Sequence, residues 1–418
     1  MNLTREQRDA VLCDENTLIE ACPGSGKTRT LVAKLLHCLD GVRNTSRKIA
    51  CVTYTNAAVY EIEHRVREYG SSGDEDYCDI STIHSFCLVN ILNHFYWRIP
   101  EYSGGFSVLT PEAEQYQKTA SDVLAEHGLP KQLAEGFENV NRQPDGTPTS
   151  SELGLSVVID FWERLQKKGF IDFPNIIYYS HRLLAENPSL ARALSCKYAW
   201  MLVDEFQDTT ELQVEILRRI AKVGNTKFFL VGDPCQSIFG FAGARVELME
   251  KFGDEIGANL GFRLLANYRS SEKIVQHAER VFSRTPPMYA VGETADADIE
   301  PVYVHADTAF EAIRDSFLPS LKTLGIEYGE AAIIAPWWVK LWHLGKALRE
   351  MGVPIVGPGA RPYRKSHLFA ALAEQVCAFI AYPSRKGLYQ IEKELFLLLN
   401  PKNAIAFNEP FTRILLSQ

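Results

Sequence analysis

The chain has 418 residues, of which 46% are hydrophobic and 23% charged, as in soluble globular proteins of two to four domains. Its apolar runs stay below about 18 residues and its first residues are polar, so we expect no transmembrane helix, no signal peptide and a cytoplasmic location. The net charge of −8 does not indicate a nucleic-acid partner, and the nine cysteines include no C-x-x-C pair, which argues against a zinc ribbon or a disulfide scaffold.

The first part of the chain alternates between predicted strands and predicted helices. Residues 17–21 are apolar and predict a strand, and residues 29–39 carry leucines at helical spacing. A second apolar run, at residues 48–54, predicts the next strand, and Asn56 is expected to cap the helix after it. This alternation predicts a parallel sheet covered by helices.

The segment between the first strand and the first helix, ACPGSGKT at residues 21–28, has the pattern of a phosphate-binding loop with Ala21 in place of the first glycine. Small residues let backbone N–H groups surround phosphates, and the helix N-terminus adds a positive end. Lys27 is expected to reach the β- and γ-phosphates and the Thr28 hydroxyl to bind Mg²⁺. The alternative is a chance glycine-rich turn, which the flanking strand and helix argue against. The expected nucleotide-binding residues here are Pro23, Gly24, Ser25, Gly26, Lys27, Thr28 and Arg29.

Residues 92–190 differ in character from the first part of the chain. They are rich in predicted helix and include a polar, turn-prone stretch at residues 141–151, which we interpret as a helical insertion with a mobile loop. The strand pattern returns at residues 198–203 and 228–231.

Two carboxylates, Asp204 and Glu205, follow the predicted strand at residues 198–203. An apolar strand that ends in two acids is typical of a Walker B motif when a phosphate-binding loop lies in the same domain. Asp204 is expected to hold Mg²⁺, and Glu205 to orient and deprotonate the attacking water. Adenylate-type kinases need no such acid pair, and the Asn-Lys-x-Asp motif of GTPases is not found, so the expected nucleotide is ATP.

Six segments, in order along the chain, resemble motifs of the UvrD/Rep group of superfamily 1 DNA helicases. The resemblance extends over about residues 1–275, and the strings of its fourth and fifth segments are specific to this subgroup. The segments are LTREQRDAV at 3–11 (Q motif), TYTNAA at 53–58 (motif Ia), STIHSF at 81–86, DEFQDT at 204–209 (motif II), GDPCQSIFGFAGA at 232–244 (motif III) and NYRS at 267–270 (motif IV).

The resemblance implies roles for four further residues at the nucleotide. Gln7 would read adenine, and Tyr268 would stack on it. Gln236 would sense the γ-phosphate and couple it to DNA. Arg269 would contact the γ-phosphate as an arginine finger, stabilising charge that develops during phosphoryl transfer. A surface salt bridge is the alternative for Arg269.

The resemblance also implies a path for single-stranded DNA. Phe241 takes the place of an aromatic residue on which a base stacks, an interaction worth about 1–3 kcal/mol per base. Tyr54, Asn56 and His84 would lie along the same path. Phe241 and His84 could instead be core residues, and Tyr54 could pack within its strand.

The chain departs from the family pattern in two respects. Ala57 and Ala242 stand where the family often has basic residues, so contacts to phosphate are expected to be missing and DNA affinity to be lower and less salt-dependent. Motifs V and VI are not found after residue 275, and the second domain is expected to be truncated near residues 392–418.

The predicted fold is α/β: a P-loop NTPase (RecA-like) parallel-sheet domain with a helical insertion, then a second, incomplete RecA-like domain. Apolar runs at residues 301–305 and 331–334 predict strands of the second domain. The predicted segments are 1–91 and 191–264 for the first RecA-like domain, 92–190 for the insertion (1B-like) and 265–418 for the second domain (2A-like).

Two functions fit these motifs. The first is an ATP- and Mg²⁺-dependent DNA helicase or translocase that moves 3′ to 5′ on single-stranded DNA or on DNA with a 3′ single-stranded end. The second is a nucleotide-sensing regulatory subunit that binds DNA ends or a partner nuclease, as in phage-defence complexes, without unwinding. ATPase turnover with and without single-stranded DNA distinguishes them, and neither involves a membrane.

Overall fold

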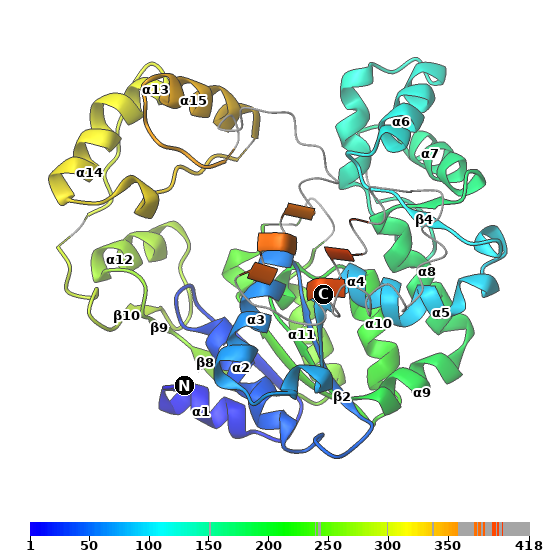
Figure 1. Ribbon diagram of the computed structural model, residues 1–418. Helices are drawn as coiled ribbons and strands as arrows, with labels where there is room; N and C mark the ends of the chain where they lie inside the picture. The colour runs from blue at the N-terminus through cyan, green and yellow to red at the C-terminus, as the bar shows by residue number, and fades with distance from the viewer. Residues whose placement is uncertain are drawn as a thin grey trace, which may run out of the picture. The chain divides into compact units, whose positions relative to one another are not determined.

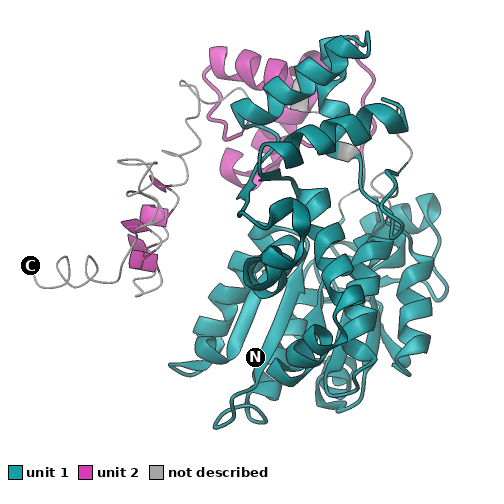
Figure 2. Ribbon diagram, turned by 90° about the vertical axis from the view of Figure 1, so that its right-hand side faces the viewer, with its two compact units in different colours: residues 1–301 teal, residues 302–418 magenta. Residues whose placement is uncertain are grey.

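A computed structural model describes residues 1–149, 152–238, 240, 244–298, 300–336 and 338–357, with several short stretches between residues 372 and 395. The chain divides into two compact units, residues 1–301 and 302–418, which Figure 2 colours separately. The predicted division into four domain segments stays a prediction. None of the helices described here combines the length and the apolar character that crossing a bilayer requires.

The first unit is built on a six-stranded sheet covered by helices (Figure 1). The strand order is β3-β2-β6-β7-β1-β8, and every pair of neighbouring strands is parallel. The predicted α/β fold with a parallel sheet is therefore confirmed, and the four strands expected in this unit all belong to the sheet. The strands are β1 (Thr17–Ala21), β2 (Lys48–Thr53), β3 (Cys78–Thr82), β6 (Tyr198–Val203), β7 (Lys227–Gly232) and β8 (Asn259–Leu264).

Successive side chains of the central strands enter two different hydrophobic cores, because side chains alternate between the faces of a sheet. In β6, Trp200 and Leu202 join one core, whereas Met201 and Val203 join the other. Both faces are covered, so these strands are apolar along their whole length. The helices on the face of Trp200 and Leu202 are α1 (Arg5–Leu12), α2 (Lys27–Leu39) and α3 (Asn56–Tyr69). The helices on the face of Met201 and Val203 are α4 (Ile83–Cys87), α8 (Phe173–Glu186), α9 (Pro188–Lys197), α10 (Glu211–Ala221) and α11 (Glu247–Glu255).

Helix α3 is capped one residue earlier than the sequence suggested. Its N-cap is Thr55, whose hydroxyl accepts the backbone N–H of Ala58 at 3.2 Å, whereas Asn56 is the first helical residue. Thr55 keeps the extended backbone that an N-cap needs, so the prediction of Asn56 as the cap is wrong.

The region between β3 and β6 is helix-rich, as expected, and has a core of its own. Its main helices are α6 (Glu114–Glu126) and α7 (Leu155–Lys167), and Phe137 stacks on Phe161 at a centroid distance of 4.2 Å. The polar stretch after residue 140 forms a turn closed by an antiparallel bridge between Arg142 and Pro148. The short elements of this region are α5 (Asn93–Phe95), β4 (Ser107–Val108) and β5 (Phe170–Ile171).

Beyond β8 the first unit ends with β9 (Ala266–Asn267), which pairs in parallel with β10 (Tyr289–Ala290), and α12 (Glu272–Val281) between them. The described part of the second unit contains α13 (Ala309–Ala312), α14 (Leu318–Leu324) and α15 (Trp338–Glu350).

The two strands predicted for the second unit do not form. Residues 301–305 and 331–334 have no strand pairing, and Val302 and Ile334 are 81% and 91% exposed. A strand is stabilised by ladder hydrogen bonds to a neighbour, and these apolar runs find none within the described residues. The prediction of strands there is wrong, because an apolar run does not by itself supply a pairing partner.

A buried lysine fastens α1 to the sheet domain. The Lys34 ammonium group, on α2, donates to the carbonyl oxygens of Val11 at 3.0 Å and Cys13 at 2.6 Å, and it lies 4.1 Å from the centre of the Trp200 ring. Burial lowers the pKa of Lys34. The last carbonyl groups of a helix have no hydrogen-bond donor within the helix. Lys34 supplies a donor to two such carbonyls at the end of α1 and so holds α1 in place.

We predict that Lys34→Met lowers the free energy of unfolding by about 1–3 kcal/mol, because two carbonyl oxygens lose their donor. Chemical denaturation measures this change, and hydrogen exchange should show lost protection in α1. Lys118→Met, at an exposed position of α6, is the control and should change little. Equal stability of the two variants would show that Lys34 does not hold α1.

Candidate nucleotide-binding site

The loop between β1 and α2 has a backbone that requires two of its glycines. Gly24 and Gly26 have φ values of 69° and 82°, in the left-handed region. A Cβ on Gly24 would lie 2.8 Å from Arg269 Cβ, and one on Gly26 would lie 2.8 Å from Gln7 Nε2. The glycines therefore let two distant segments, the start of α1 and the turn after β9, pack directly against the loop.

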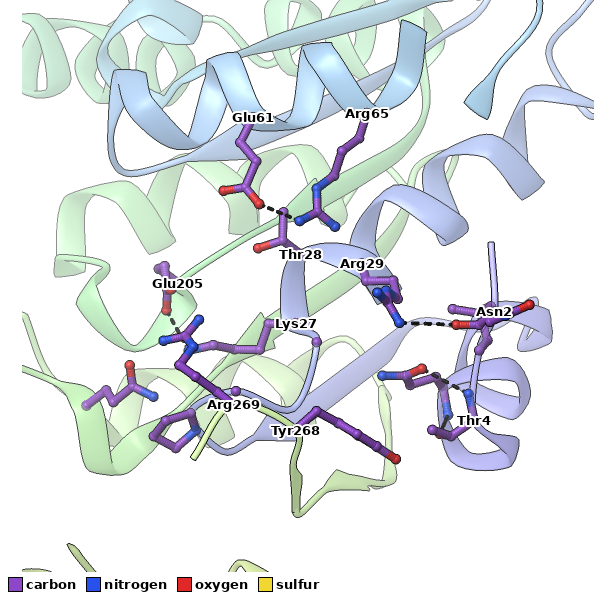
Figure 3. A pocket seen from close by; sticks show the side chains of 16 residues that line it. Asn2, Thr4, Lys27, Thr28, Arg29, Glu61, Arg65, Glu205, Tyr268 and Arg269 are labelled. Atoms are coloured by element: carbon purple, nitrogen blue, oxygen red, sulfur yellow. Dashed lines mark hydrogen bonds and ion pairs between the residues drawn. The ribbon is translucent and has the colours of Figure 1, made fainter. Parts of the chain in front are cut away.

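The loop faces the acidic end of β6. Lys27 Nζ lies 3.1 Å from Glu205 Oε2 and donates to it, as Figure 3 shows. Glu205 has φ 48° and ψ 46°, a left-handed conformation that costs about 1–3 kcal/mol for a residue other than glycine. Gln207 Nε2 donates to the same Glu205 oxygen at 2.8 Å. Lys27 and Gln207 thus hold the Glu205 carboxylate beside the loop by two hydrogen bonds.

Asp204, the last residue before this turn, is 5% exposed. Its backbone N–H donates to the carbonyl of Val52 at 2.9 Å, and its Oδ1 accepts the N–H of Glu205 at 3.1 Å. Burial, and then the charge of Glu205, raise the pKa of Asp204 to about 7. The Asp204 carboxylate and the Thr28 hydroxyl are hard oxygen donors, the type that suits Mg²⁺.

Gln7 joins α1 to the phosphate-binding loop. Its side chain is buried; Nε2 donates to the carbonyl of Ser25 at 2.8 Å, and Oε1 accepts the backbone N–H of Thr4 at 3.0 Å. The latter bond belongs to a capping box that begins α1. The amide of Gln7 is therefore held at both ends, beside the loop.

Asn267 shapes the turn that carries Tyr268 and Arg269. The Asn267 Oδ1 atom accepts the N–H groups of Arg269 and Ser270, each at 2.8 Å. The backbone N–H of Tyr268 donates to the carbonyl of Gly24 at 3.0 Å. The turn is thus bonded to the loop itself, and its two long side chains project into the pocket (Figure 3).

These segments surround a cavity of about 710 Å³. In Figure 3, Lys27, Glu205 and Arg269 gather at one end, and Asn2, Thr4 and Arg29 at the other. Most of the nucleotide-binding and catalytic residues predicted from the sequence line it. The lining residues are Asn2, Leu3, Thr4, Gln7, Pro23, Gly24, Gly26, Lys27, Thr28, Arg29, Glu61, Arg65, Glu205, Gln236, Tyr268 and Arg269.

Two predicted residues stand back from the cavity. Ser25 is buried and its hydroxyl donates to the carbonyl of Cys22 at 2.7 Å, so its side chain stabilises the conformation of the loop. Asp204 is buried next to Glu205 and is not part of the lining. Two further residues that line the cavity were not predicted: Glu61 and Arg65, both on α3, which form an ion pair at 2.8 Å. Their signal was the spacing of four residues on one helix face, just after motif Ia.

Three of the four residues predicted for a DNA path, Tyr54, Asn56 and His84, lie where β2 and β3 end. Thr53 and Thr82, the last residues of β2 and β3, are paired in register. Tyr54 and His84, which follow them in the chain, therefore lie at the neighbouring ends of these two strands. Burial and the charge of Asp208 raise the pKa of Tyr54, and burial lowers the pKa of His84 to about 4, so its ring is neutral at pH 7.

One aromatic residue of this region was not predicted. Phe173, at the start of α8, packs edge-on against the His84 ring with centroids 5.4 Å apart, and 39% of it is exposed. No local pattern connects these two residues, because they are far apart in sequence. Asn56 is exposed at the start of α3, and Phe241 lies outside the described residues.

Comparison with known proteins identifies relatives. Residues 3–257 match the family described as the UvrD/REP helicase N-terminal domain. The chain is 29% identical to DNA helicase II of Salmonella typhimurium over 66% of its own length, and 27% identical to DNA helicase II of Escherichia coli over 73%. It is also 27% identical over 67% of its length to the ATP-dependent DNA helicase PcrA of Staphylococcus aureus. The alignments span 40%, 44% and 40% of those three proteins, less than half of each.

The raised pKa of Asp204 predicts a pH-dependent stability. Its folded-state pKa of about 7 exceeds the ordinary 3.8, so the folded protein loses stability as the pH rises from about 4 to about 7. The side-chain amide of the Asp204→Asn variant cannot ionise. Above pH 7 we therefore expect Asp204→Asn to be more stable than the unmodified chain, by about 1–4 kcal/mol, and the difference to vanish towards pH 4.

Denaturant titrations at pH 4, 6 and 8 measure this difference. The exposed Asp122→Asn, on α6, is the matched control and should show no such trend. A difference between Asp204→Asn and the unmodified chain that is the same at every pH would contradict the raised pKa.

Proposed function

Because the chain belongs to the UvrD/REP helicase family, we propose that it is an ATP-dependent DNA helicase or translocase that moves 3′ to 5′ on single-stranded DNA. One observation carries the proposal: the Lys27–Glu205 contact of 3.1 Å closes a phosphate-binding loop onto an acidic strand end inside a large cavity. A loop lysine and a positioned carboxylate are the two charges that triphosphate hydrolysis needs.

The cavity offers the nucleotide two ends of different character. At the base end, Tyr268 supplies an aromatic face, Arg29 a planar cation, and Gln7 an amide beside the loop. At the phosphate end, the first turn of α2 presents its N–H groups and Lys27 its ammonium. ATP fits this polarity with the adenine against Tyr268 and the γ-phosphate towards Glu205.

Hydrolysis follows from the residues at the phosphate end. Phosphate oxygens compete with Glu205 for Lys27, and the released carboxylate accepts a proton from the attacking water. Arg269 and Gln236 donate to the γ-phosphate as charge develops on it. Thr28 and Asp204 would hold Mg²⁺, which neutralises phosphate charge when bound.

The DNA strand would pass over the ends of β2 and β3. Tyr54, Asn56, His84 and Phe173 offer rings and an amide there, and Phe241 is proposed as the base-stacking aromatic. Aromatic stacking is indifferent to sequence, as a translocase requires. Cycles of ATP binding and hydrolysis would advance the strand across these side chains.

We predict that Glu205→Gln lowers the ATPase kcat by about a hundredfold or more while ATP binding persists, since only the proton acceptor is lost. Lys27→Ala should also weaken ATP binding, by about tenfold or more, because a charged donor to phosphate is removed. Turnover assays and titration with a fluorescent ATP analogue separate the two effects.

The control for both variants is Glu250→Gln, at an exposed position of α11. Normal turnover by Glu205→Gln would refute its role as base. Tight ATP binding without turnover by the unmodified chain, with or without single-stranded DNA, would instead favour a nucleotide-sensing subunit.

Phe173→Ala should raise the Kd for a single-stranded oligonucleotide about fivefold to a hundredfold, as the loss of one stacked base predicts, and leave basal ATPase unchanged. Fluorescence anisotropy with labelled oligonucleotides measures the change. Phe282→Ala, which removes an exposed ring beyond α12, is the control. Equal affinity of the two variants would remove Phe173 from the DNA path.

A further inference from the structure

The amide of Gln236 is aimed by a single buried carboxylate. Gln236 Nε2 donates to Asp233 Oδ2 at 2.6 Å, and Asp233 Oδ1 accepts the N–H of Cys235 at 3.0 Å, capping the short helix of residues 234–236. The backbone N–H of Asp233 donates to Gln207 Oε1 at 2.9 Å. Asp233 therefore sets both the turn that carries Gln236 and the direction of its side chain.

The charge of Asp233 is balanced by a residue 51 positions further along the chain. Arg284 Nη2 donates to the same Oδ2 atom at 2.9 Å, and the Arg284 and Asp233 side chains are 11% and 3% exposed. A buried carboxylate is strongly destabilised without a partner, so the ion pair with Arg284 stabilises Asp233 in the position from which it accepts the amide N–H of Gln236.

Arg284 is held in place independently of Asp233. Glu279, on α12, accepts the backbone N–H of Arg284 at 2.9 Å and that of Met288 at 3.1 Å, which fixes the loop between them. Met288 packs with Cys22 of the phosphate-binding loop in one small hydrophobic cluster. The backbone around Arg284 is thus anchored by bonds that do not involve its guanidinium group.

We propose that Arg284 is a positioning residue for ATP hydrolysis, which through Asp233 aims the amide of Gln236 into the nucleotide cavity. This rests on the proposed function, because Gln236 acts there on the γ-phosphate. Without the guanidinium group, Asp233 loses a partner of its Oδ2 atom and turns that oxygen towards another donor, and Gln236 loses its fixed direction. Arg284 itself does not border the cavity. Its guanidinium group contacts Asp233 and also Glu279, at 3.5 Å, and Asp233 is the contact that links it to Gln236.

A double-mutant cycle tests this. Arg284→Met, Gln236→Ala and the double variant are compared for kcat, KM and affinity for a fluorescent ATP analogue, with single-stranded DNA saturating. We expect each single variant to lower kcat about tenfold or more and to change nucleotide affinity less than about threefold. The double variant should be no more than about twofold slower than Gln236→Ala alone, since residues in one chain of contacts are not additive.

Arg284→Lys keeps the charge but not the planar donor geometry, so its kcat should lie between those of Arg284→Met and the unmodified chain. If Arg284→Met does not fold, Arg284→Lys replaces it in the double-mutant cycle. Arg280→Met, exposed on α12, is the matched control and should behave like the unmodified chain. Losses that multiply in the double variant, or an unchanged kcat for Arg284→Met, would overturn the proposal. An unmodified chain without ATPase activity would instead refute the proposed function.

Discussion

The ion pair between Lys27 and Glu205 joins two segments that lie 178 residues apart, and the site is organised around it. Its geometry follows from the strand order, because β7 lies between β1 and β6 and all three run parallel. Parallel strands bring their carboxyl ends to one edge of a sheet, where ligands bind. The phosphate-binding loop, the acidic turn and the Gln236 turn each begin at such an end.

This edge concentrates unfavourable features that the rest of the domain must offset. Asp204 is buried, Glu205 has a left-handed backbone, and burial with the charge of Glu205 raises the pKa of Asp208 to about 6. Lys27 and Gln207 stabilise this acidic turn with direct bonds. The two covered faces of the sheet supply the apolar burial that offsets these costs, as in other proteins whose functional sites lower their stability.

The sequence predicted what depends on short, local patterns. Four of the six sheet strands (β1, β2, β6 and β7), the phosphate-binding loop and the acid pair each lie within one continuous segment, so composition and spacing were sufficient for them. The strands β3 and β8 were not predicted. Predictions failed where a neighbour decides the outcome. The apolar runs at 301–305 and 331–334 lack strand partners among the described residues, and the backbone of Thr55 rather than the residue type of Asn56 sets the cap. The contacts of Phe173 with His84 and of Arg284 with Asp233 join residues far apart along the chain, so no local sequence pattern predicts them.

The central claim is that ATP binds with its γ-phosphate between Lys27 and Glu205. A crystal structure with Mg²⁺ and a non-hydrolysable ATP analogue tests it most directly. A phosphate oxygen should replace Glu205 as the partner of Lys27 Nζ, with the adenine against Tyr268. An analogue bound elsewhere, or a Lys27–Glu205 pair still at 3.1 Å with no phosphate on Lys27, would contradict the claim.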